Sequence, residues 1–325
     1  MIKYWEEKNG KLFECNQDAD AKNMWIDARS INREDIRILE ETYNIDQEHI
    51  LDILDQDEIS RIEQTDDYTL IILRLPLYKP DSEISYITVP LGIVLFKNTI
   101  ITICWTDCEV LHDLSANRIK DLTLNDFTAM IIRILSRSDT IFLRYLKEIN
   151  RRSTAIQQTL ERSVKNNELM LLLNLGKSLE FFATSLKGNQ MLLEKITKSH
   201  ILKLDADDKD WLEDVTIDNK QALEMTNTYS NILTSMMETF ASVISNNLNI
   251  VMKRLTVISL VLMVPTFIVS FFGMNVPLPF AHTGWAGVIV ISFVCLITTG
   301  FTTLVLSDRR KSKKVPKIKE KRNNR

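Results

Sequence analysis

Two long apolar runs dominate the last quarter of the chain. They are Leu255–Phe272 and Trp285–Leu306, and no Asp, Glu, Lys or Arg occurs between Leu255 and Ser307. At a rise of 1.5 Å per residue, the first run would form a helix about 27 Å long and the second a slightly longer one. Both are long enough to cross the hydrocarbon core of a bilayer. Only about a dozen residues separate them, too few for a folded domain. The pattern predicts two antiparallel transmembrane helices.

Earlier in the chain the apolar runs are shorter and rich in Ile, Val and Leu. Tyr68–Leu77 and Gly92–Trp105 are strand-like, and Lys97-Asn98 interrupts the second run as a hairpin tip would. Apolar residues at 50, 53, 54 and 59 instead have helical spacing. We therefore expect a mixed α/β domain in which short helices flank a sheet.

The middle of the chain has the pattern of long helices. The segment from Asn125 to Ser199 is amphipathic and predicts two long antiparallel helices. No Gly or Pro follows until Pro265, so one helix is expected to run from about Trp211 into the first apolar run. The expected organisation is a cytoplasmic α/β domain (1-125), long antiparallel helices (126-206), a cytoplasmic stalk helix (207-254), a transmembrane pore helix (255-273), an extracytoplasmic loop (274-284), a second transmembrane helix (285-306) and a basic cytoplasmic tail (307-325).

Charge predicts the orientation in the membrane. Lys253 and Arg254 precede the first apolar run, and ten Lys and Arg follow the second between Asp308 and Arg325. Positive flanks remain in the cytoplasm, so both termini are expected there and the protein in the cell membrane. The net charge of the chain is −3, and the tail from Asp308 to Arg325 carries +8. Residues 1 to 307 therefore carry −11. An acidic body beside apolar spans favours a cationic ligand or a lipid surface as partner, and disfavours nucleic acid.

One face of the long helix is polar. Small or polar residues and Met recur at alternating steps of three and four, a period of 3.5 that predicts a left-handed bundle around a common axis. Close packing of small residues in a membrane would explain part of this face, but water along it explains both the membrane part and the stalk. The face comprises Ser242, Ser245, Asn249, Met252, Thr256, Ser259, Met263, Thr266, Ser270 and Gly273, and continues backwards through Glu238, Ser235 and Asn231.

The uncharged character of this face inside the membrane indicates how an ion would pass. A bare divalent cation would meet a very large desolvation cost there, and Mg2+ releases its waters reluctantly. A hydrated ion is therefore expected, with its waters held by oxygens of Asn249, Thr256, Ser259, Thr266 and Ser270. Met252, Met263 and Leu255 are then expected as apolar constrictions, with core packing as the alternative for each.

The remaining chemistry of the sequence is sparse. The four cysteines, Cys15, Cys104, Cys108 and Cys295, contain no CxxC pair and are expected to be reduced packing residues, with a metal pair at Cys104 and Cys108 as the weaker alternative. No catalytic motif or phosphate-binding loop occurs, and the four histidines are scattered, so no enzyme and no organic cofactor are expected. The N-terminus has no apolar stretch and is not read as a signal peptide.

The end of the first apolar run resembles a known family. Phe272-Gly273-Met274-Asn275, preceded by MKRLTVISLVLMVPTFIVSF, is similar to the CorA family of magnesium channels, and the resemblance extends over nearly the whole chain. It implies a funnel-shaped homopentamer that mediates influx of hydrated Mg2+. Co2+ and Ni2+ stay open as further ions, because their hydrated forms are similar to hydrated Mg2+ in size and charge. It also implies a selectivity filter of Gly273, Met274 and Asn275 at the outer mouth.

The same resemblance implies inhibition by cytoplasmic Mg2+ bound between neighbouring subunits. Asp214 matches the family's stalk carboxylate by its distance from the GMN motif, and Glu238 matches an acidic pore position. Asp207, Asp208 and Asp210 lie near Asp214 in the sequence and are further candidates for this regulatory site. Acidic residues at the start of a helix also complement the helix dipole, which is the alternative explanation for the cluster. The partner carboxylate on the α/β domain stays open among Asp81, Glu83, Asp107 and Glu109.

The chain departs from the family pattern in two places. Phe272 stands where Tyr is usual, and the loop VPLPFAHTGW lacks an acidic residue that would concentrate cations, with His282 as a softer ligand or a plain loop residue. Two alternatives remain. One is a ZntB-like zinc transporter, against which Met274 argues because those proteins usually have GIN. The other is a non-conducting membrane-anchored sensor or scaffold.

Overall fold

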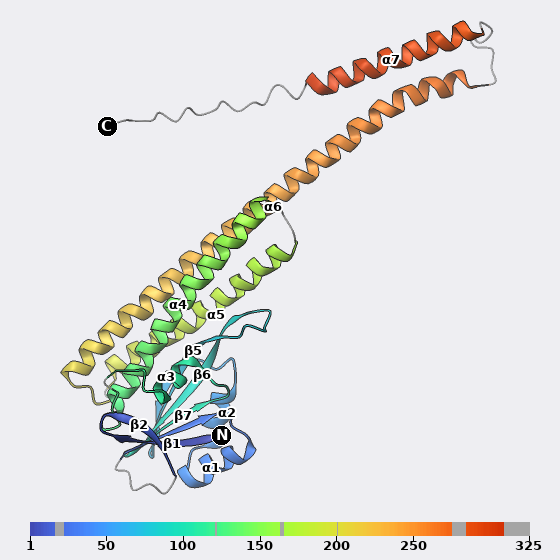
Figure 1. Cartoon of the computed structure of the whole chain (residues 1–325). Coiled ribbons are helices and arrows are strands. Elements are labelled where there is room, and N and C mark those ends of the chain that lie inside the picture. The colour runs from blue at the N-terminus through green and yellow to red at the C-terminus, as the bar shows by residue number, and fades with distance from the viewer. Residues whose placement is uncertain (17–22, 121, 163–165, 200, 275–283, 309–325) are drawn as a thin grey trace, which may run out of the picture. The chain divides into compact units, whose positions relative to one another are not determined.

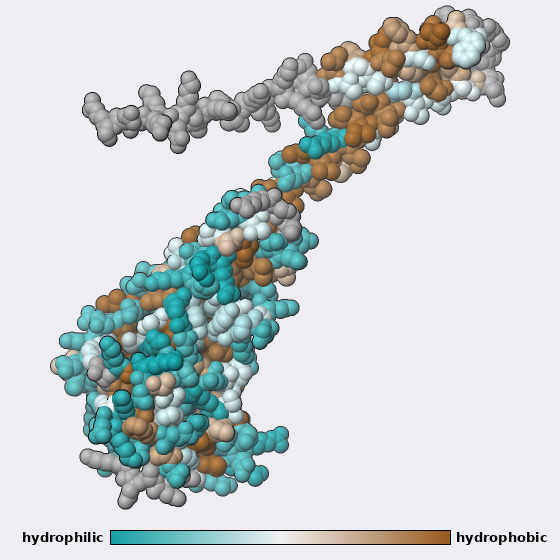
Figure 2. Space-filling model, viewed as in Figure 1, coloured by the Kyte–Doolittle hydropathy of each residue, from teal (hydrophilic) through white to brown (hydrophobic). Residues whose placement is uncertain are grey.

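The computed structural model describes residues 1–16, 23–120, 122–162, 166–199, 201–274 and 284–308. The chain forms two compact units, Met1–Phe240 and Ala241–Arg325, and the helix α6 (Ala206–Phe272) contributes to both (Figure 1). Hydrophilic residues cover much of the visible face of the first unit, whereas hydrophobic residues predominate on the helices of the second (Figure 2).

The first unit is built on one seven-stranded sheet. The strands, in their order across the sheet, are β2 (Lys11–Cys15), β1 (Ile2–Lys8), β3 (Met24–Arg29), β7 (Thr99–Cys104), β6 (Tyr86–Leu95), β5 (Thr69–Tyr78) and β4 (Arg61–Gln64). Neighbouring strands are antiparallel except β3 and β7, which are parallel. A sheet with short helices between its strands confirms the expected mixed α/β domain.

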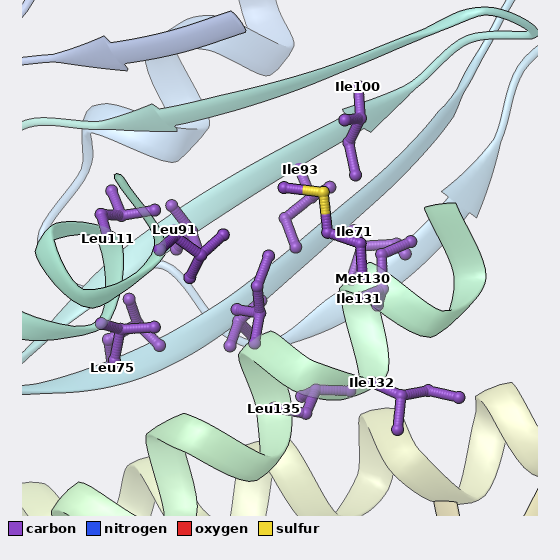
Figure 3. Packing of buried hydrophobic residues seen from close by; sticks show 14 of the residues in the cluster. Ile71, Leu75, Leu91, Ile93, Ile100, Leu111, Met130, Ile131, Ile132 and Leu135 are labelled. Atoms are coloured by element: carbon purple, nitrogen blue, oxygen red, sulfur yellow. The ribbon is translucent and has the colours of Figure 1, made fainter. Parts of the chain in front are cut away.

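Both faces of the sheet are covered by helices. Residues of β5 alternate between the two faces: Leu70 and Ile72 pack with α1 (Arg33–Tyr43) and α2 (Gln47–Leu54), whereas Ile71 packs with α3 (Glu109–Ser115) and α4 (Phe127–Arg162). Figure 3 shows this second layer, where Leu91 of the sheet lies near Leu111, and Ile71 and Ile93 lie near Met130 and Ile131 of α4. Burial on both faces explains why β5, β6 and β7 are continuous apolar runs.

Gly92 marks the closest approach between a helix and the sheet. A Cβ atom at this position would lie 2.5 Å from Ile53 Cγ1 and closer still to its Cδ1, so a larger residue would collide with α2. Ile53 and Ile50 are completely buried at this contact. The missing side chain at Gly92 therefore lets α2 pack directly on β6.

Two expected boundaries are wrong. β6 begins at Tyr86 instead of Gly92, because Pro90 is tolerated in a stretch that pairs with β5 alone; β7 joins only from Gly92. The expected helical pattern through residue 59 ends at Leu54, since Asp57 N donates to Asp55 Oδ1 at 3.0 Å and forms a turn. Ile59 is consequently exposed in the loop before β4.

The two long helices expected between residues 125 and 199 are present. α4 and α5 (Asn166–Lys198) run side by side in opposite directions (Figure 1). Phe142 of α4 meets Phe182 of α5 edge to face, with ring centroids 5.0 Å apart. Within the first unit, α6 adds Leu212, Val215 and Ala222 to the buried core.

The second unit holds the rest of α6 and α7 (Trp285–Asp308). From Ala241 to Phe272 no side chain of α6 is buried in a single chain. Three helices in the described part are long and apolar enough to cross a membrane: α5, α6 and α7. Of the most apolar window of each helix, 39% is buried in α5, 0% in α6 and 6% in α7. Many of the apolar side chains of α5 therefore pack inside the first unit.

Candidate functional site

The polar face expected on the long helix lies on one uninterrupted helix. All of its positions from Asn231 to Ser270 fall within α6, so steps of three and four residues place them along one side. In a single chain the eight expected pore-lining residues are exposed: Asn249, Met252, Leu255, Thr256, Ser259, Met263, Thr266 and Ser270. Lipid-facing residues are exposed as well, so it is polarity that distinguishes this face.

Two threonines on this face have their hydroxyl hydrogens already engaged. Thr256 Oγ1 donates to Met252 O at 2.9 Å, and Thr266 Oγ1 donates to Leu262 O at 2.7 Å. A hydroxyl that has donated its hydrogen to its own helix presents only lone pairs to the surroundings. Waters around a cation direct their hydrogens outwards, so these two oxygens are suited to accept from a hydrated cation.

Pro265 supplies a further acceptor in the same segment. It lies inside α6 and has no N–H, so the carbonyl of Val261 loses its usual helical donor. Within the apolar segment, unused carbonyl oxygens are expected only where water, an ion or another polar group reaches them. This makes the helix around Pro265 more polar than its side chains indicate.

The expected filter lies at the carboxyl end of α6. Gly273 N donates to Val269 O at 3.0 Å and to Ser270 O at 3.2 Å, and Met274 N donates to Phe271 O at 3.4 Å. A Cβ atom at Gly273 would meet Val269 O at 3.4 Å, which is ordinary contact, so the fold of one chain does not require glycine here. Asn275 and His282 lie outside the described residues.

The acidic cluster at the start of α6 separates into a cap and exposed carboxylates. The helix begins at Ala206, one residue before the expected start of the stalk helix at 207, because Asp205 and Asp208 bond reciprocally to each other's backbone N–H. Asp208 is 4% exposed, and this burial raises the pKa of its carboxyl. Asp207, Asp210 and Asp214 are exposed on the same helix, as is Glu238 further along.

The four candidate carboxylates on the α/β domain differ in their partners. Arg29 Nη1 lies 2.6 Å from Asp107 Oδ1. Glu109 binds Arg144 and accepts from Tyr145 Oη at 3.0 Å, and the Arg144 hydrogen bond lowers the pKa of Glu109. Asp81 and Glu83, on the exposed turn between β5 and β6, have no cationic partner among the described residues. They are the two of the four whose charge is uncompensated within the described chain.

A single chain does not assemble a metal site from these groups. Among the described residues, no three Asp, Glu, His or Cys side chains lie close enough to hold one ion. The thiols of Cys104 and Cys108 lie within hydrogen-bonding reach of each other in the core, and all four cysteines are free. A metal at the cysteine pair would therefore lack further ligands of these types in this part of the chain.

The fold and this helix together define a class. The chain is a membrane protein in which a soluble α/β domain and long helices precede apolar C-terminal helices. Residues 20–313 match the family described as CorA-like Mg2+ transporter protein. The chain is also 26% identical to the cobalt/magnesium transport protein CorA of Methanocaldococcus jannaschii over 299 residues, covering 89% of this chain and 93% of that protein. The chain belongs to the CorA-like Mg2+ transporter family.

Solved structures agree on the fold. The complete CorA magnesium transporter of Methanocaldococcus jannaschii matches with a TM-score of 0.80 and 23% identity, over 97% of this chain and 99% of that one. The ZntB cytoplasmic domain of Vibrio parahaemolyticus matches with a TM-score of 0.59 and 13% identity, over 76% of this chain and 97% of that one. The expected fold class, an α/β domain followed by long helices and apolar C-terminal helices, is confirmed.

Proposed function

We propose that this chain is one subunit of a homo-oligomeric channel through which hydrated divalent cations enter the cell. Mg2+ is the leading ion, and Co2+ and Ni2+ are further ions of similar hydrated size. Family membership supports transport, and the relative from Methanocaldococcus jannaschii is named for cobalt and magnesium. The single observation that carries the mechanism is the α6 face on which Thr256 and Thr266 present only acceptor lone pairs.

Several subunits are needed to make a pathway. Two apolar helices per chain cannot enclose water, and α6 has no buried side chain between Ala241 and Phe272 in a single chain. Copies of α6 arranged around an axis would cover its other sides and leave the polar face wet. We take the number to be five, as the family resemblance implies. The termini lie in the cytoplasm, and the filter Gly273, Met274 and Asn275 lies at the outer mouth.

Regulation by cytoplasmic Mg2+ fits the distribution of carboxylates. Asp214 is exposed on α6, and Asp81 and Glu83 are uncompensated on the described α/β domain. An ion between Asp214 of one subunit and Asp81 or Glu83 of the next would join carboxylates that the described part of a single chain does not bring together. Its loss at low internal Mg2+ would separate the subunits and loosen the pathway.

The test is flux through purified protein in liposomes, with Mg2+, Co2+ and Zn2+ compared at several internal Mg2+ concentrations. Asn275→Ala is expected to abolish Mg2+ flux while the oligomer remains intact by size-exclusion chromatography. Thr303→Val, at a hydroxyl on α7, is the matched control and should leave flux unchanged. Flux of Zn2+ without Mg2+ would favour a ZntB-like transporter, and the absence of any flux in the unmodified protein would favour a scaffold.

A further inference from the structure

Two buried polar side chains meet between α4 and α6. Asp139 of α4 is 2% exposed and Asn219 of α6 is 0% exposed, and Asn219 Nδ2 donates to Asp139 Oδ1 at 3.2 Å. Both residues lie within Met1–Phe240, so the contact is internal to one compact unit. Apolar residues one turn away on either side of the pair are buried: Leu135 and Phe142 on α4, and Val215 and Ala222 on α6.

One atom of this pair lacks a partner. Asn219 Oδ1 is buried and accepts no hydrogen bond from the described residues. A buried amide oxygen normally has a donor, because its loss of water is otherwise uncompensated. An ionised Asp139 offers acceptors only, whereas a protonated Asp139 carries an O–H that donates while its other oxygen accepts. An acid–amide pair thus accounts for both the hydrogen bond that is present and the donor that is missing.

We propose that Asp139 is a protonated carboxylic acid at neutral pH, joined to Asn219 by two hydrogen bonds, and that this pair is a pH-sensitive link between α4 and α6. α6 is the helix that continues into the proposed ion pathway. The pair lies outside the carboxylates assigned to cation binding. It holds α6 against α4 without a charge in the apolar layer.

The surroundings of Asp139 favour the neutral form. Burial is the main cause that raises the pKa of Asp139; the Asn219 N–H lowers it, and the negative charge of Asp218 on α6 raises it further. Among the described residues, no Lys or Arg forms an ion pair with Asp139. The buried polar residues of the helices packed here are neutral apart from Asp139 itself and Asp208: Ser138 and Ser153 on α4, Ser178, Ser185 and Asn189 on α5, and Asn219 and Thr226 on α6.

Loss of the proton from Asp139 would turn its attractive contact with Asn219 into a repulsive one. The ionised carboxyl has no hydrogen to donate, so its oxygen would face the oxygen of Asn219, and a charge would lie between apolar residues. The proton would pass to solvent as the two helices separate locally. A rise in cytoplasmic pH is therefore expected to weaken the α4–α6 contact.

The first experiment identifies the proton directly. Asp139→Asn is isosteric, and its amide both donates and accepts, so it should preserve both hydrogen bonds. Infrared spectra of the full-length protein at pH 7 should show a protonated-carboxyl band that is absent in D139N and moves in Asn219→Leu. If the protonated-carboxyl region of the D139N spectrum equals that of the unmodified protein, Asp139 is ionised and the proposal is overturned; N219L gives the same decision if D139N does not fold.

The second experiment uses the pH dependence of unfolding. The pKa of Asp139 is higher in the folded than in the unfolded chain, so its contribution to stability is complete below the unfolded value and is lost as pH rises towards the folded value. Between these two values the unfolding constant of the unmodified protein should rise tenfold per pH unit relative to D139N. Glu213→Gln, at an exposed carboxyl of α6, is the control and should show no such trend. A constant ratio for D139N, or a ratio that falls as pH rises, contradicts the proposal.

A third measurement links the pair to transport and rests on the proposed function. Mg2+ flux in liposomes should depend on internal pH in the unmodified protein and depend less on it in D139N. Identical pH profiles in both would remove the pair from regulation even if the infrared band is present. The absence of flux in both would contradict the proposed function instead, and the first two experiments would still decide the state of Asp139.

Discussion

Asp205 and Asp208 hold each other's backbone at the start of α6. Asp208 N donates to Asp205 Oδ1 at 2.7 Å, and Asp205 N donates to Asp208 Oδ2 at 3.2 Å. This reciprocal arrangement satisfies two backbone donors at the helix N-terminus and explains why the helix begins there. Asp208, which the sequence groups with the regulatory carboxylates, is thus engaged in capping, while Asp214, between one and two turns later, is exposed.

The cap and the sensor are expected to separate on mutation. Asp208→Ala should lower the free energy of unfolding by about 1 kcal/mol, the usual effect of losing an N-terminal cap, and leave the proposed inhibition by internal Mg2+ unchanged. Asp214→Ala should retain stability and weaken that inhibition. Chemical denaturation and liposome flux at varied internal Mg2+ measure the two effects. Equal loss of inhibition in both variants would show that Asp208 also binds the ion.

The sequence predicts the fold better than its boundaries. The apolar runs predict the strands and the long helices because burial on both faces of a sheet, or on one face of a helix, leaves a periodic pattern. The misplaced start of β6 depends on Pro90 having no β7 partner, which is a tertiary detail that periodicity does not contain.

The candidate site was likewise only partly predictable from the sequence. The polar face of α6 is visible in the sequence, because spacing alone places residues on one side of a helix. The choice of Asp81 and Glu83 over Asp107 and Glu109 is not visible, since it depends on Arg29 and Arg144 reaching across the fold. Asp139 gave no signal either, because one Asp on an amphipathic helix is usually a solvent-facing residue.

Gly92 offers a test of the packing between α2 and the sheet. Gly92→Ala should destabilise the first unit by about 1 to 3 kcal/mol, because the new methyl group would overlap Ile53. Ile53→Val shortens the side chain and should recover part of the loss when combined with G92A. Denaturant unfolding of the full-length protein measures both. Additive losses in the double variant would mean that the two residues do not compete for the same space.

The hydroxyl of Thr266 offers a test of whether the polar face of α6 meets water. Thr266→Val keeps the shape of the side chain but removes the acceptor, and should lower Mg2+ flux about fivefold if one hydrogen bond of about 1 kcal/mol to a hydrated ion is lost. Thr266→Ser keeps the hydroxyl and should retain most of the flux. Thr303→Val on α7 serves as the control away from the face. Unchanged flux in T266V would place Thr266 away from water.

The ion pairs of Glu109 predict a response to acid. The pKa of Glu109 is lowered chiefly by the hydrogen bond from Arg144, and burial opposes this. A carboxyl with a lowered folded pKa contributes stability above its unfolded pKa of about 4.3, and loses it as pH falls through the folded pKa. Glu109→Gln should therefore be less stable than the unmodified protein at pH 7 and approach it in acid. The control Glu213→Gln should show no convergence when urea unfolding is compared at both pH values.

The turn between β5 and β6 is the last test, because its carboxylates are the uncompensated ones. Asp81→Asn with Glu83→Gln should weaken inhibition by internal Mg2+, since the proposed intersubunit ion would lose its ligand on the α/β domain. Asp107→Asn should not, because Asp107 is already paired with Arg29 at 2.6 Å. The measurement is flux against internal Mg2+, with D214A as the reference for a lost sensor. If D107N reproduces D214A while the Asp81 and Glu83 double variant does not, the ion is held nearer to α3 and the turn has no part in sensing.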